Sequence, residues 1–106
     1  MHLTLTRFEV TPAMERAQIV SLFEQSLPRY RAVPGLLSKH YYLEEGGRFA
    51  GGVYLWAGRE DAEAFLTPAF AEAIRTRFGG TPAVTHLVCP LSLDNAPHAQ
   101  RTAAPL

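Results

Sequence analysis

The segment of residues 48–66, RFAGGVYLWAGREDAEAFL, constrains the fold of this chain more than any other. Residues 49–57 are mainly strand-forming, and at Gly58 the apolar spacing changes from a period of two to a period of 3.6. Because glycine can cap the start of a helix, the segment predicts a strand that leads directly into a helix. Tyr54 and Trp56 end this strand, which marks the junction as a place for a pocket.

Proline and glycine positions divide the rest of the chain into further elements. Thr11-Pro12 predicts the start of a helix, and Pro28 predicts its end near Leu27. Pro68 interrupts the second helical region, and a Gly-Gly pair ends it. The predicted strands span residues 2–10, 36–44, 49–57 and 83–91, and the predicted helices span residues 12–27, 59–66 and 69–78.

This β-α-β-β-α-β order predicts an α+β fold, the ferredoxin-like sandwich, for residues 1–93. Such a fold has a four-stranded antiparallel sheet with both helical regions on one face. Residues 94–106 show no apolar period, and we expect them to form a C-terminal tail.

Composition and charge exclude several classes of protein. The 106 residues fit one domain, and a content of 47% hydrophobic and 19% charged residues argues against disorder. Ten basic residues balance ten acidic ones without a basic run, so no nucleic acid partner is expected. The chain has one cysteine, no signal-peptide pattern and no apolar run long enough to span a membrane. These features predict a cytoplasmic protein with no membrane partner.

The predicted strands carry apolar residues on both faces, although the helices can cover only one face of a sheet. In the third strand, Val53 and Leu55 alternate with Tyr54 and Trp56, and all four are large and apolar or aromatic. An exposed apolar sheet face would be buried if it packed against the same face of a second copy. We therefore predict a homodimer through sheet faces; cover by the tail or by long loops is the alternative.

A candidate site follows from the pairing of the second and third strands. If the hairpin turns at residues 45–47, several aromatic and histidine side chains share one face of the sheet. These are His40, Tyr42, Tyr54 and Trp56, which surround the small residues Ala50 and Gly52. Large side chains with polar tips around two very small residues predict a hollow that could hold a small molecule.

The chemistry of these side chains suggests their roles. His40 could move a proton near neutral pH, and so could His86 if its strand turns it toward the hollow. Tyr42 or Tyr54 could hydrogen-bond a phenolic or enolate oxygen, and Trp56 could stack on a planar ring. The alternative is that the aromatic residues anchor a core or an interface. The histidines lack the spacing of metal ligands, so no metal is expected.

Three segments together resemble the YdhR-like mono-oxygenases of the dimeric α+β-barrel superfamily. They are Pro34-Gly35-Leu36, AGGVYLW at residues 50–56 and DAEAFL at residues 61–66. The resemblance implies a ferredoxin-like homodimer with pockets between sheet and helices. It also implies oxidation of polycyclic aromatic substrates without a metal or flavin cofactor. Related antibiotic-biosynthesis mono-oxygenases have a helix histidine where this chain has Phe65, so Phe65 is expected in the pocket wall and a mechanism needing that histidine is not supported.

Two functions are therefore compatible with the sequence. The first is a mono-oxygenase without cofactor, or a related isomerase or cyclase, that acts on a small planar aromatic or polyketide-like compound. The second is a non-catalytic small-molecule-binding or stress-response module that uses the same hollow. A purely structural domain, in which all the aromatic residues lie in interfaces, is a third interpretation.

Overall fold

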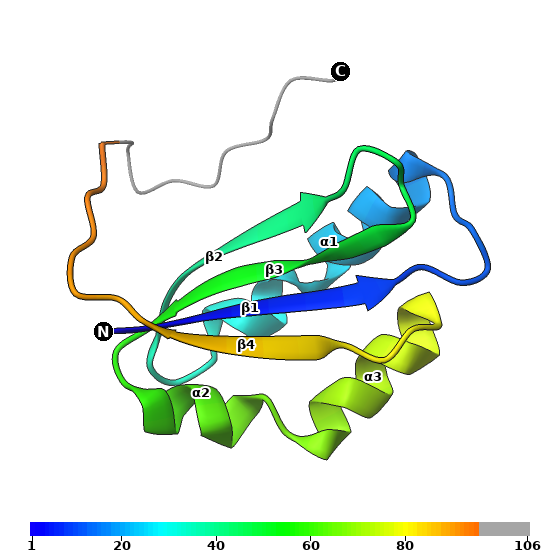
Figure 1. Ribbon diagram of the computed structural model, residues 1–106. Coiled ribbons are helices and arrows are strands. Elements are labelled where there is room, and N and C mark those ends of the chain that lie inside the picture. The colour runs from blue at the N-terminus through cyan, green and yellow to red at the C-terminus, as the bar shows by residue number, and fades with distance from the viewer. Residues whose placement is uncertain (96–106) are drawn as a thin grey trace.

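The computed structural model describes residues 1–95 and contains four strands and three helices in this part of the chain. Their order is β1 (His2–Glu9), α1 (Arg16–Arg31), β2 (Leu36–Leu43), β3 (Phe49–Trp56), α2 (Arg59–Phe65), α3 (Pro68–Phe78) and β4 (Ala83–Val88). The sheet has the order β2-β3-β1-β4, and every neighbouring pair is antiparallel. The helices lie on one side of this sheet (Figure 1), so the predicted ferredoxin-like α+β fold is confirmed.

The junction at Gly58 and the break at Pro68 have the predicted form. Gly58 is the N-cap of α2, and α3 begins at Pro68 with Thr67 as its N-cap. The Thr67 hydroxyl accepts a hydrogen bond from the backbone N–H of Phe70. Gly79 is the C-cap of α3, and its φ of 97° is a conformation that L side chains rarely adopt.

Three predicted boundaries are wrong by three residues or more. Helix α1 begins at Arg16 instead of residue 12, because Glu15 and Gln18 form a capping box that satisfies its first backbone groups. The helix also continues through Pro28 to Arg31. Proline there removes one backbone hydrogen bond near the helix end, while Tyr30 in the last turn packs against Tyr41, Tyr54 and Phe65. Strand β4 ends at Val88, three residues earlier than predicted.

The two faces of the sheet differ in an unexpected way. In β1 the side chains that point toward the helices are mostly polar, and Thr4 and Thr6 are fully buried there. Leu3 and Leu5 point to the other side of the sheet, which we call the open face. The open face thus carries the leucines of β1, whereas part of the helical face depends on hydrogen bonds between buried polar groups.

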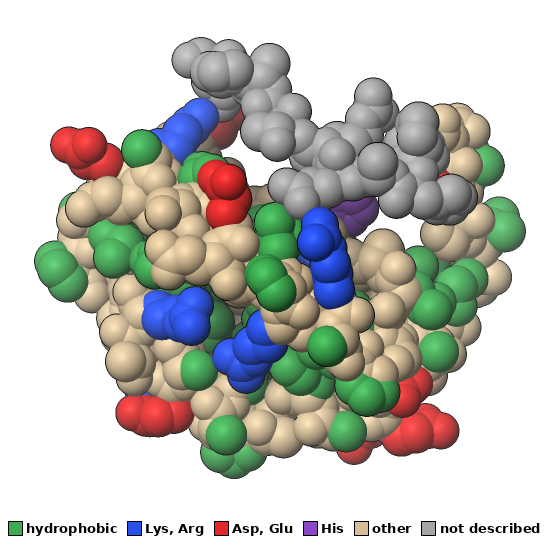
Figure 2. Space-filling model, turned by 180° about the vertical axis from the view of Figure 1, so that it is seen from behind, with side chains coloured by type: hydrophobic (Ala, Val, Ile, Leu, Met, Phe, Trp, Pro, Cys, Tyr) green, Lys and Arg blue, Asp and Glu red, His purple; other side chains and the backbone are tan. Residues whose placement is uncertain are grey.

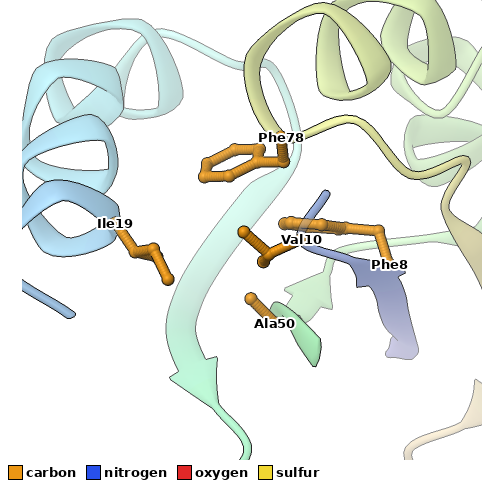
Figure 3. Packing of buried hydrophobic residues seen from close by; sticks show 5 residues of the cluster. All are labelled: Phe8, Val10, Ile19, Ala50 and Phe78. Atoms are coloured by element: carbon orange, nitrogen blue, oxygen red, sulfur yellow. The ribbon is translucent and has the colours of Figure 1, made fainter. Parts of the chain in front are cut away.

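Two hydrophobic clusters fill the layer between sheet and helices. The first joins β1, α1, β3 and α3 and consists of Phe8, Val10, Ile19, Ala50 and Phe78 (Figure 3). The second lies around Tyr54, Trp56 and Ala62 at the other end of the sheet. Of the predicted tail, residues 96–106 lie outside the described part of the chain. None of the described helices has the length and apolar character needed to cross a membrane.

Candidate functional site

The pairing of β2 with β3 differs by one residue from the predicted register. Tyr42 lies opposite Gly51, and the loop that joins the strands closes with a hydrogen bond from Glu44 N–H to the Phe49 carbonyl. A slip of one residue turns every side chain of a strand to the other face. His40 and Tyr42 therefore lie on the open face, away from Tyr54 and Trp56, and the predicted grouping of these four residues is wrong.

Three of the predicted site residues do lie together on the helical side. The Tyr54 and Trp56 rings are nearly parallel, with centroids 5.7 Å apart, and Phe65 of α2 lies 6.0 Å from Trp56. Trp56 is completely buried, and its indole N–H donates a hydrogen bond of 2.9 Å to the Thr4 hydroxyl. Of Tyr54, Trp56 and Phe65, Tyr54 is the one whose side chain also lines a cavity.

The other predicted residues have different surroundings. His40 is exposed on the open face, opposite Val53. Tyr42 donates a hydrogen bond of 2.8 Å to the Thr6 carbonyl, passing over Gly51 in the intervening strand. The role of each residue as a catalytic or binding group stays a prediction.

His86 lies on the helical face of β4 and forms a pair with His2. The His2 Nε2 and His86 Nδ1 atoms are 2.8 Å apart, and one ring donates while the other accepts. Burial and the neighbouring His86 lower the pKa of His2. Neither ring belongs to the lining of the cavity. Residues 1–95 contain no group of three or more His, Cys, Asp or Glu that could hold a metal ion.

The cavity lies between the sheet and helices α1 and α3. Its volume is about 40 Å³, which is enough for water or a few ligand atoms without movement of its walls. Its walls are aromatic and basic, with Arg29, Tyr30, Lys39, Tyr41, Tyr54 and Arg77 among the lining residues. The sequence analysis predicted a hollow beside Gly52. In the structure the side chain of Lys39 occupies this space, because a Cβ added at Gly52 would lie 3.0 Å from Lys39 Cε.

Lys39 is the one lysine in a chain whose other nine basic residues are arginines. Its Nζ atom lies 3.2 Å from the ring centroid of Tyr30, 3.9 Å from that of Tyr41 and 4.7 Å from that of Tyr54. Lys39 belongs to none of the ion pairs seen within residues 1–95, so no carboxylate of this part of the chain neutralises it. We call Lys39 and these three tyrosines the tyrosine cage.

Burial changes the proton equilibria of the tyrosine cage. Burial, with a smaller contribution from the Arg29 charge, lowers the pKa of Lys39 to about 6. Burial also raises the pKa of Tyr30 and Tyr41, and raises that of Tyr54 well above its ordinary value. The phenol groups are consequently protonated at neutral pH, while Lys39 can exchange its proton there.

Sequence reasoning missed Lys39 because a lysine in a strand is usually a solvent-exposed residue. Two signals could have found it. One is that Lys39 is the single lysine among many arginines, and the other is that Tyr30 and Tyr41 lie at positions i−9 and i+2 from it. The correct register would have placed Lys39 directly beside Tyr54.

Comparisons with known proteins support the fold. No protein-family model matches the chain, and no curated protein matches it either. Among solved structures, a protein of unknown function from Nitrosomonas europaea is 20% identical, with a TM-score of 0.70 over 91% of this chain and 95% of its own. SnoaB, a cofactor-independent oxygenase from Streptomyces nogalater, is 20% identical, with a TM-score of 0.63 over 87% of this chain and 95% of its own.

A monooxygenase from Streptomyces coelicolor, solved with the ligand nanaomycin D, is also similar. It is 18% identical, with a TM-score of 0.64 over 90% of this chain and 92% of its own. Other similar structures are described as antibiotic biosynthesis monooxygenases. At these identities the similarity establishes the architecture and nothing finer. The chain therefore has the ferredoxin-like α+β fold of the antibiotic biosynthesis monooxygenase structures.

Proposed function

We propose that this protein is a mono-oxygenase that acts, without a metal or flavin, on a small planar aromatic or polyketide-like compound. The observation that carries this proposal is the aromatic lining of the cavity between sheet and helices, which includes Tyr30, Tyr41 and Tyr54. Because the cavity holds only about 40 Å³, these walls must move apart to admit a planar ring. Aromatic walls favour planar ligands because rings stack or meet edge to face. The shared fold with a cofactor-independent oxygenase and the YdhR-like segments in residues 34–66 add support.

Oxygen uptake with hydroxylated naphthalenes and anthracenes tests the proposal. Filling the cavity should stop the reaction, because Ala73 of α3 lines it and a phenyl group there would occupy the ligand's place. We expect Ala73→Phe to reduce oxygen uptake by at least about tenfold, equivalent to about 1.4 kcal/mol. Ala69→Phe is the matched control, since Ala69 is exposed on the same helix. Equal loss in both variants would place the reaction elsewhere.

A non-catalytic binding module is the second candidate. It is favoured by one observation: neither His40 nor His86, the predicted proton-transfer residues, lines the cavity. The module would bind the same aromatic compounds, and Ala73→Phe would abolish binding, but no oxygen would be consumed. Replacing each histidine with glutamine tests its predicted role, because a proton-transfer residue would lower turnover and leave binding unchanged.

We also propose that two copies associate through the open face. Leu3, Leu5, Val53 and Leu55 share this face, and Leu87 of β4 is 43% exposed there. An apolar face of this kind suits a two-fold contact with itself. We expect Leu55→Asp to halve the mass measured by light scattering, since a charge would be buried in the contact. Ala69→Asp, on the helical side, should leave the mass unchanged. A wild-type protein of single-chain mass would refute the dimer.

A further inference from the structure

We propose that Lys39 accepts the proton of an acidic aromatic hydroxyl group (a phenol, naphthol or enol) bound in the cavity, so that the ligand is held there as its anion. This inference rests on the proposed function for the location of the ligand. It adds the ionisation state of that ligand and the residue that receives its proton. It does not require oxygen to react.

The position of the amine supports this role. Lys39 comes from β2 and crosses above Gly52, where a Cβ would crowd both Lys39 and Tyr54. Its Nζ atom then ends between the faces of three tyrosine rings at the cavity wall. A ligand ring that enters this cavity meets the amine and the aromatic faces together. A desolvated lysine beside another cation is a recognised way to obtain a basic, uncharged amine in a protein.

The charge around the cavity supports an anionic ligand. Arg29 of α1 and Arg77 of α3 line the cavity with Lys39, and no aspartate or glutamate is among the lining residues. Figure 2 shows basic side chains near the middle of the helical side and most acidic ones toward its edges. Arg29 and Arg77 are exposed, and their charges attract an anion to the cavity. A neutral hydroxyl compound that loses its proton inside the cavity supplies that anion.

The step is a simple proton transfer. The O–H bond of the ligand breaks, an N–H bond forms on Lys39 Nζ, and the products are an aromatic oxyanion and an ammonium group. No electrons are transferred. The titratable and charged groups that face Lys39 are Arg29 and Tyr30 from α1, Tyr41 beside it in β2, Tyr54 from β3 and Arg77 from α3. Burial keeps the three phenols protonated, so none of them competes with the ligand as an anion.

A chromophoric phenol tests this inference without turnover. 4-Nitrophenol absorbs visible light as its phenolate and not as its neutral form. At one pH unit below its pKa in water, we expect binding to the wild-type protein to raise the phenolate fraction about fivefold or more, since a tenfold change corresponds to one unit. Lys39→Met should bind the neutral form and show no such increase. An equal increase in Lys39→Met, or none in the wild-type protein, would overturn the inference.

Calorimetry in buffers of different ionisation enthalpy separates proton transfer from simple attraction to a positive charge. At pH 8, where Lys39 is uncharged, the proton of a phenol that is neutral in water, such as 2-naphthol, moves to Lys39, so binding to the wild-type protein should release almost none to the buffer. Lys39→Arg is the control, because a guanidinium attracts the phenolate but cannot take up its proton. This variant should release about one proton for each phenolate bound. Release of one proton by the wild-type protein would show that Lys39 is already charged and would refute the inference.

Lysine labelled with ¹³C at Cε gives one reporter signal in this chain, because Lys39 is its single lysine. We expect this signal to show an uncharged amine at pH 8 in the free protein and a protonated amine once the phenol is bound. A protonated amine in the free protein at that pH, or an amine that stays uncharged in the complex, would overturn the inference. If the phenolate forms and no substrate consumes oxygen, the proposed mono-oxygenase function fails and the role of Lys39 stands. If Lys39→Met consumes oxygen as fast as the wild-type protein, the mono-oxygenase function stands and the proposed role of Lys39 fails.

Discussion

Lys39→Met should increase the free energy of unfolding at pH 7. It should also make this free energy rise less steeply between pH 7 and pH 9 than it does in the wild-type protein. Folding lowers the pKa of Lys39 from 10.5 to about 6, so between these values the unfolded chain binds one proton more than the folded chain. The stability of the wild-type protein therefore rises with pH in this window, by at most about 1.4 kcal/mol per unit. Lys39 lowers the stability of the folded protein most below pH 6, where the buried amine is charged in the folded state as well. Methionine fills similar space and has no proton to lose.

Urea unfolding of both proteins at pH 7, 8 and 9 and at one protein concentration measures this effect. We expect the stability advantage of Lys39→Met to shrink by about 1–3 kcal/mol from pH 7 to pH 9, because contacts with the three ring faces favour the charged amine and offset part of the burial cost. Arg16→Met provides the control, since Arg16 is an exposed cation on α1. Parallel pH curves for Lys39→Met and the wild-type protein would show that Lys39 keeps its charge on folding.

The fold could be predicted because its boundaries depend on local chemistry. Gly58 and Pro68 act through their own backbone properties, and the structure uses both where the sequence predicts. The start of α1 was missed because two caps competed, and the Glu15–Gln18 pair prevailed over Thr11-Pro12. Such competition is decided by how the loop packs, which a sequence pattern does not contain.

The candidate site was harder to predict because it depends on a register. Tyr54 and Trp56 share one face as predicted, whereas His40 and Tyr42 were exchanged with Lys39 and Tyr41 by a shift of one residue. Turn length alone decides this choice, since both faces of β2 carry aromatic residues and hydrophobicity does not distinguish them.

Buried threonines were a second source of error. Thr6 accepts a hydrogen bond of 3.0 Å from the Gly52 N–H, and Thr4 accepts one from the Trp56 indole. These partners make polar side chains stable inside, while Leu3 and Leu5 lie on the open face. An inward-facing threonine can be recognised only when its partner across the sheet is known.

Trp56→Ala should be the most destabilising substitution at the junction of β3 and α2. The side chain is fully buried between Tyr54, Phe65 and Ala62, so its removal leaves a large cavity. Large-to-small substitutions of this kind cost about 3–5 kcal/mol. The Thr4 hydroxyl, which is completely buried, would also lose its partner. Because small domains have only about 5–15 kcal/mol of stability, the variant should unfold at much lower urea concentration than the wild-type protein.

Trp56→Phe separates the packing of this residue from its hydrogen bond. A phenyl ring can remain beside Tyr54 and Phe65 but has no N–H to donate to Thr4, so we expect a smaller cost of about 1–3 kcal/mol. The double variant Trp56→Phe with Thr4→Val removes both polar partners and should recover part of that cost, since no buried hydroxyl is left without a donor. Urea unfolding followed by far-ultraviolet circular dichroism gives the free energy of unfolding of the wild-type protein and its variants without relying on tryptophan fluorescence. If Thr4→Val lowers the free energy of unfolding as much in the Trp56→Phe protein as in the wild-type protein, the two substitutions are independent. The hydrogen bond between Trp56 and Thr4 would then not contribute to the stability of this junction.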